Sequence, residues 1–87
     1  MESRSFIKAA NQLAKNIRDY RMQEVVLGSN NSQQRAHLQR EANNLFAVMH
    51  NPTLLAADNL YTAAMEAGLQ VAPAVQQKIH RGRQMWN

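Results

Sequence analysis

Hydrophobic residues recur at spacings of three and four along the first 27 residues, which is the period of one face of an α-helix. The members of this stripe are Phe6, Ala10, Leu13, Ile17 and Tyr20. Ser3 or Ser5 is suited to cap the start of the helix, and Gly28 is suited to end it in a left-handed conformation. The pattern predicts one helix over about residues 3–27, roughly 36 Å long.

A second stripe with the same period follows over about residues 32–49. Its members are Leu38, Ala42, Leu45 and Met49. Candidates for its N-cap are Ser29, Asn31 and Ser32. Because only a short turn-forming segment separates the two long stripes, they are predicted to pair as an antiparallel helical hairpin.

Two shorter helices are predicted in the second half of the chain. Asn51 is a suitable cap and Pro52 a suitable first residue for a helix over about 52–67, which Gly68 ends. Its apolar positions are Leu54, Leu55, Ala57, Leu60, Tyr61, Ala64 and Met65, and both Met65 and Met49 are expected in the core. The last helix is predicted over about 73–82, with Val75, Ile79 and Gly82 on its inner face. Residues 83–87 either extend this helix or form a flexible tail.

The chain is therefore predicted to be all-α: a small four-helix domain, with a long antiparallel helical hairpin followed by two shorter helices. No run of alternating β-branched residues predicts a strand, and alanine, the strongest helix former, recurs throughout. A length of 87 residues suits a single domain over 1–87. A chain this short buries only about 60–65% of its unfolded surface, so its core is thin and a partner is expected.

The sequence carries little that indicates catalysis. The three histidines, His37, His50 and His80, lie 13 and 30 residues apart, which is not the spacing of a metal-binding helix face. There is no cysteine, and the three glycines are too dispersed for a phosphate-binding loop. Asp58 lies on an otherwise apolar helix, where a solvent-facing position is expected. We expect neither an enzyme nor a bound cofactor or metal.

Targeting signals are missing from the sequence as well. The first residues lack the uninterrupted apolar run of a secretory signal, and no stretch approaches the roughly 18 consecutive apolar residues of a membrane span. The expected location is cytoplasmic, with no membrane partner.

The formal charge of +4 is unevenly distributed along the chain. Residues 1–50 carry +3, residues 51–72 carry −2 and residues 73–87 carry +3. The segment from Ala64 through Gly68 into the last helix partly resembles a helix-turn-helix at about 60–82. Its second helix would present to DNA the residues Gln76, Gln77, Lys78, His80 and Arg81. The apolar register requires a turn one residue longer than the motif has, and any helical hairpin would produce the same glycine, so nucleic acid is the alternative partner.

A protein partner is the favoured interpretation. The chain has more apolar side chains than a thin core covers, including Val25, Val26 and Leu27 at the end of the first helix. Tryptophan and arginine are enriched at interface hot spots. The candidate contact residues are therefore Lys78, Arg81, Arg83, Met85 and Trp86. The predicted function is that of a non-catalytic accessory or regulatory protein, such as an inhibitor or adaptor, and self-association as a homo-oligomer is a third alternative.

Overall fold

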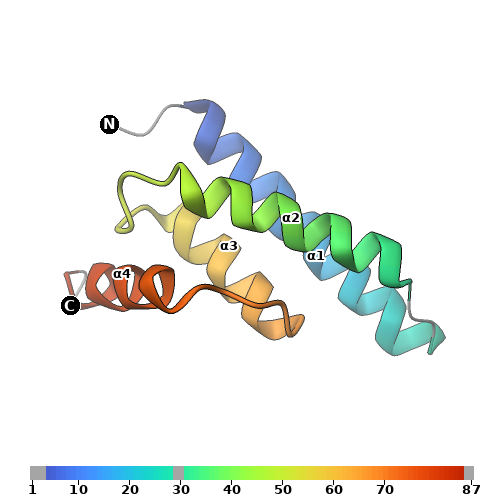
Figure 1. The fold of residues 1–87 in the computed structure, drawn as a ribbon. Coiled ribbons are helices and arrows are strands. Elements are labelled where there is room, and N and C mark those ends of the chain that lie inside the picture. Colours follow the sequence, from blue (N-terminus) through green and yellow to red (C-terminus); the bar gives the residue numbers. More distant parts are fainter. Residues whose placement is uncertain (1–3, 29–30, 86–87) are drawn as a thin grey trace.

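The computed structural model describes residues 4–28 and 31–85, and it confirms the all-α, four-helix prediction. The helices are α1 (Arg4–Leu27), α2 (Ser32–Ala47), α3 (Leu55–Glu66) and α4 (Pro73–Gln84). Figure 1 shows α2 running back alongside α1 as the second arm of a hairpin, while α3 runs in the same general direction as α1. Ser3, Ser29 and Trp86 lie outside the described residues.

The core is built mainly between α1 and α3, which make the most extensive contacts of any helix pair. Both helices contribute small side chains to it: Ala10 and Ala14 from α1, and Ala56, Ala57, Ala63 and Ala64 from α3, all buried. Small side chains let two helix backbones approach closely, and the larger Ile17 and Leu60 fill the space beside them. All five residues of the predicted α1 stripe are buried, which confirms that prediction.

The helix ends follow the local chemistry of the sequence, with one difference. Gly28 and Gly68 adopt positive φ values of 64° and 74° after α1 and α3, and the Asn31 side chain accepts a hydrogen bond from the backbone N–H of Gln34 at 3.1 Å. The start of α3 at Pro52 is wrong: the helix begins at Leu55. The reason is that Asn51 Oδ1 accepts hydrogen bonds from the backbone and hydroxyl of Thr53, which closes a separate turn.

Burial confirms part of the predicted inner faces of α2 and α3. Leu38, Ala42 and Met49 are buried as expected. The core prediction for Met65 is wrong, since its side chain is 45% exposed, and Leu55 is exposed as well. Both residues lie outside the alanine-rich face of α3, which is the face buried in the core.

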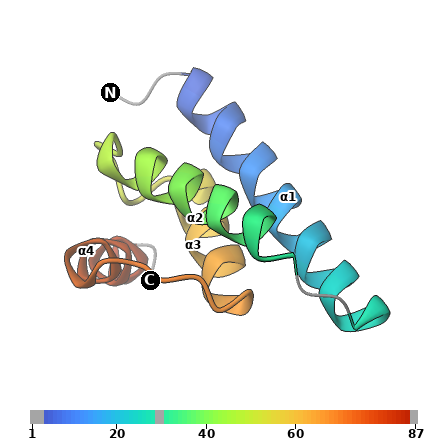
Figure 2. The same cartoon turned by 45° about the vertical axis from the view of Figure 1, so that its right-hand side comes forward.

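The last helix packs against α3 and against the turn that precedes α3. Ile79 is fully buried. Gly82 approaches the turn so closely that a Cβ at this position would lie 2.6 Å from the carbonyl oxygen of Pro52. Figure 2 views α4 almost along its axis while α3 runs across the picture, so the two helices cross at a steep angle.

Candidate partner-binding surfaces

The inner side of α4 is held to α3 by Arg83. Its Nε lies 2.5 Å from Asp58 Oδ1, and its Nη2 donates to the hydroxyl of Thr62 at 3.1 Å. The guanidinium also lies 5.2 Å from the ring centroid of Tyr61. Arg83 was a candidate contact for a partner, and the structure instead places its charge against three side chains of α3.

Asp58 is half-buried and so less exposed than the solvent-facing position expected of it. Its side chain is only 23% exposed, because α4 covers this side of α3 and brings a cation to it. The pairing joins residues 25 positions apart, so periodicity within α3 alone does not reveal it. In the first turn of α3, the carboxylate also lies where the helix dipole favours a negative charge.

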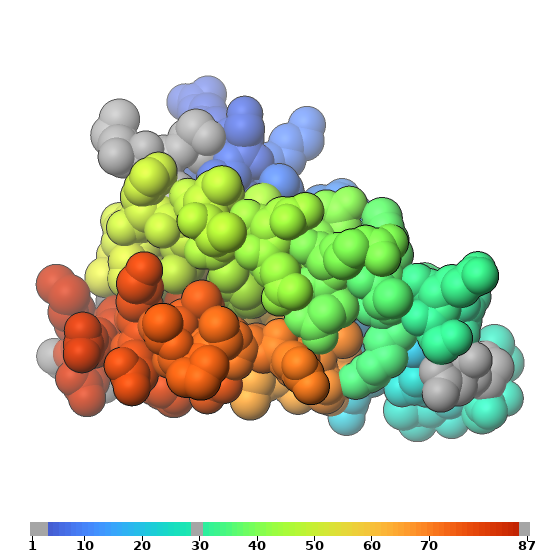
Figure 3. Space-filling model, in the orientation of Figure 1, coloured from blue at the N-terminus to red at the C-terminus, as the bar shows by residue number. Residues whose placement is uncertain are grey.

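The outer side of α4 brings together part of the predicted contact set. Lys78, Arg81 and Met85 lie on one exposed face, with spacings of three and four residues, and the exposed Gln77 flanks them. We call Lys78, Arg81 and Met85 the α4 stripe. In the space-filling view, α4 forms the lower left of the visible surface (Figure 3).

Two other predicted DNA contacts are engaged within the chain. The side-chain amide of Gln76 donates to the carbonyl oxygen of Val71 at 2.7 Å. The ring of His80 lies edge-on to Tyr61, with centroids 5.9 Å apart. His80 nevertheless remains exposed, as Gln77, Lys78 and Arg81 are, whereas Gln76 is half-buried.

The connection between α3 and α4 differs from the turn of a helix-turn-helix. It comprises residues 67–72, six in all, whereas the motif uses about three or four. The backbone N–H of Leu69 bonds to the carbonyl of Ala64 at 2.9 Å around the left-handed Gly68, which is a common way of ending a helix. The resemblance therefore extends to the glycine and the steep crossing of the helices, and not to the length of the turn.

The largest group of exposed apolar side chains lies elsewhere, at the end of α1. The last two turns of this helix extend beyond the end of α3, as Figures 1 and 2 both show. Met22, Val25, Val26 and Leu27 are 62–71% exposed there. We call these four residues the α1 tip. Soluble proteins rarely leave apolar side chains grouped in this way unless they contact a partner.

The sequence does contain a signal for the tip. The core stripe of α1 reaches Tyr20, and the next position on that face is Glu24 rather than a hydrophobic residue. Met22, Val25 and Val26 therefore lie off the stripe, on the side that the core does not use. The predicted contact residues lie at the C-terminus, whereas the most exposed group of apolar side chains in the described residues lies at the end of α1.

A hollow of about 370 Å³ lies beside the tip, lined by Arg18, Arg21, Met22, Val25 and Glu66. One wall is fixed by Arg18, whose Nε lies 3.6 Å from Glu66 Oε1 and whose Nη1 donates to Asn59 Oδ1 at 2.6 Å. The hollow therefore has an apolar side, formed by Met22 and Val25, and a basic side.

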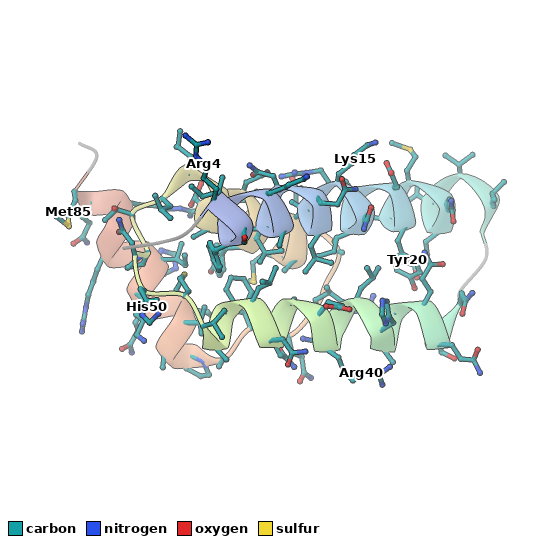
Figure 4. The ribbon with its side chains drawn as sticks, turned by 90° about the horizontal axis from the view of Figure 1, so that it is seen from above. Arg4, Lys15, Tyr20, Arg40, His50 and Met85 are labelled. Atoms are coloured by element: carbon teal, nitrogen blue, oxygen red, sulfur yellow. The ribbon has the colours of Figure 1, made fainter. Side chains whose placement is uncertain are left out.

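The base of the tip is held in place by a polar network. The hydroxyl of the buried Tyr20 donates to Glu24 Oε2 at 2.9 Å. Burial of the ring, reinforced by the Glu24 carboxylate, raises the pKa of Tyr20. Arg35 of α2 donates to the carbonyl oxygens of Ala67 and Gly68 at 3.0 and 2.7 Å, which joins the hairpin to the end of α3. The α1 tip therefore follows a part of the helix that hydrogen bonds hold in place. Figure 4 shows Tyr20 projecting from α1 towards α2.

A further hollow lies between the two arms of the helical hairpin. A groove of about 560 Å³ between α1 and α2 is lined partly by Asp19, His37 and Glu41, and His37 Nε2 lies 3.6 Å from Glu41 Oε1. Among residues 4–28 and 31–85, no three His, Cys, Asp or Glu side chains gather as metal ligands would. Within the same residues, no helix has both the length and the apolar character needed to cross a membrane.

Comparison with protein-family models, with curated proteins and with solved structures finds no match for this chain. The two candidate binding surfaces of the molecule are the α1 tip and the α4 stripe.

Proposed function

We propose that the protein is a non-catalytic accessory or regulatory protein that binds a surface of a larger protein through the α1 tip. The observation that carries the proposal is the exposure of four adjacent apolar side chains on a helix end that projects beyond α3. A cytoplasmic location and the absence of a cofactor belong to the same proposal. The cysteine-free sequence supports this location.

The energy available at the tip is substantial. Complete burial of one such side chain contributes about 1.5–3 kcal/mol. Because 62–71% of each of the four side chains is exposed in the free protein, a partner that covers them all gains on the order of 4–8 kcal/mol. Association itself costs about 4–15 kcal/mol. The tip is therefore an anchor that a partner must supplement with further contacts.

The test is affinity capture from cells of the protein's source, using the full chain. A double variant, Met22→Gln with Val26→Gln, removes apolar surface from the tip and keeps good helix formers there. Val48→Gln is the matched control, since Val48 is also exposed but lies after α2 at the other end of the hairpin. A stoichiometric partner is expected with the wild type and with the control, and is lost with the double variant. A partner retained by the double variant would overturn the assignment to the tip.

A DNA-binding function is the second candidate, because Gln77, Lys78 and Arg81 lie exposed on adjoining positions of α4. Amide and basic side chains of this kind contact base edges and phosphates. If α4 binds a duplex, the combined change Lys78→Gln and Arg81→Gln removes two phosphate contacts. The slope of the logarithm of the binding constant against the logarithm of the salt concentration then becomes shallower by about two. The absence of duplex binding at low salt would exclude this candidate.

A further inference from the structure

We propose that the partner is an acidic amphipathic helix that lies along the outer side of α1, and this inference rests on the proposed function. The apolar residues of that helix would cover Met22 and Val26 of the α1 tip. Its carboxylates would lie against Arg4, Lys8 and Lys15.

The outer side of α1 carries one continuous stripe from the first turn to the last. Its members are Arg4, Lys8, Lys15, Met22 and Val26, separated by four or seven residues. These spacings keep side chains on one face of a helix. Figure 4 shows Arg4 and Lys15 projecting from the side of α1 that faces away from α2. The stripe is basic over its first three turns and apolar over its last two, and spans roughly 33 Å.

The cations of this stripe form no ion pairs within the described part of the chain. Arg18 is paired with Glu66, whereas neither Lys8 nor Lys15 forms an ion pair with any carboxylate of residues 4–28 and 31–85. Asp19 is the carboxylate of α1 nearest to the stripe, and Glu24 faces the other way, towards Tyr20. A partner that brings carboxylates therefore gains charge complementarity here without displacing an existing pair.

A second copy of this chain fits the stripe poorly. Two copies that met only through their tips would cover four side chains each, which falls short of the roughly 1,200 Å² typical of stable interfaces. Two copies that overlapped more fully along α1 would place Lys15 close to the Lys15 of the other copy. Like charges at such an interface are unfavourable, so complementarity favours a different, acidic chain.

The arrangement of basic residues at one end of the stripe and apolar residues at the other also disfavours a nucleic acid or a membrane surface as the partner. Phosphates would pair with Arg4, Lys8 and Lys15, but they offer nothing to the apolar tip. A helix that lies on a membrane carries its apolar residues along its whole length, with cations at the margins. Here the outward-facing apolar residues occupy only the last two turns. An amphipathic helix with an apolar end and an acidic end matches both halves.

The test is a selection on the immobilised full chain with a displayed library of helices of about 20 residues. Each helix keeps an apolar stripe, and its other exposed positions vary among Glu, Gln and Lys. We expect the enriched helices to carry net negative charge and to lose binding to the variant Met22→Gln with Val26→Gln. Enrichment of neutral or basic helices, or of none, would overturn the inference.

Affinities of an enriched helix then test the basic half of the stripe. The double change Lys8→Gln and Lys15→Gln is expected to weaken binding about tenfold and to reduce its sensitivity to salt. The matched control, Lys78→Gln with Arg81→Gln on α4, removes the same charge and is expected to leave the affinity within about twofold. Equal weakening by both pairs would show that net charge, and not the stripe, attracts the helix, and would overturn the inference.

These outcomes are separate from those of the proposed function. If cellular capture depends on the tip but the selected helices are not acidic, the partner chemistry is wrong and the function stands. If capture does not depend on the tip, the proposed function fails whatever the selection yields. Sedimentation that showed a dimer disrupted by Met22→Gln with Val26→Gln would identify a second copy as the occupant and overturn the acidic partner.

Discussion

The contact between Arg83 and Asp58 determines whether Arg83 is free to bind a partner. We expect the two side chains to be energetically coupled in the folded protein. Three variants form a double-mutant cycle with the wild type: Asp58→Asn, Arg83→Gln and the combination of both. Asp58→Asn keeps the size of the side chain and removes its charge, and Arg83→Gln removes the charge and keeps a polar side chain.

The magnitude follows from the burial of the pair. Exposed ion pairs contribute about 0–1 kcal/mol, and breaking a fully buried pair costs about 3–5 kcal/mol. Asp58 is 23% and Arg83 37% exposed, which places the coupling between these limits, at about 1–2 kcal/mol. Arg83→Gln alone is expected to cost about 2–3 kcal/mol, because it also removes the hydrogen bond to Thr62 and the contact with Tyr61.

Urea unfolding of the four proteins measures the coupling, and the cycle cancels the separate effect of Asp58 on the dipole of α3. The double variant is expected to be less destabilised than the sum of the single variants. A coupling below about 0.5 kcal/mol would refute the reasoning. It would mean that Arg83 is available to a partner, as the sequence alone indicated.

Three further changes test the rest of the packing. Gly82→Ala is expected to lower the free energy of unfolding by about 1–3 kcal/mol, because the added Cβ meets the Pro52 carbonyl; stabilisation in thermal unfolding would argue against this close approach. Tyr20, whose pKa is raised above 10.0 by burial and then by Glu24, keeps its proton longer in the folded than in the unfolded state. Stability should therefore fall as the pH rises above 10.0 until the folded pKa is reached. In urea unfolding at alkaline pH, Tyr20→Phe should remove the part of the loss of stability that comes from Tyr20. An unchanged dependence of the free energy of unfolding on pH would contradict this role of Tyr20. Arg35→Gln should lower the free energy of unfolding by about 1–2 kcal/mol, because it leaves two carbonyl oxygens at the end of α3 without their donor. An unchanged midpoint of urea unfolding would contradict that role of Arg35.

Local chemistry was sufficient to predict the helices but not their pairing. The α1 stripe and the turn-forming Gly28 and Asn31 act within a few residues, so the sequence reveals them directly. The short connection correctly predicted that α1 and α2 form a hairpin. It did not predict that α1 packs more extensively on α3, because that depends on how closely alanines of distant segments approach.

In the candidate site, too, the sequence predicts what depends on neighbouring residues and not what depends on contacts between distant segments. Lys78, Arg81 and Met85 share an exposed face of α4, as helical periodicity alone would place them. The engagement of Arg83 could not be predicted in this way, because Asp58 reaches it only after α4 has folded across α3. Side chains from distant segments decide which charges remain free, and helical periodicity carries no information about them.

The α1 tip is the part of the molecule that folding explains least. α1 has 24 residues and α3 has 12, so the helix that buries most of α1 ends before the tip begins. Valine forms helices less well than glutamine or lysine, and an exposed apolar side chain gains little from this fold, so polar residues would serve stability at least as well. Met22, Val25, Val26 and Leu27 nevertheless stand on a support fixed by Tyr20 and Arg35. A rigid base under exposed apolar side chains reduces the ordering that a partner must impose, which is what a binding surface requires.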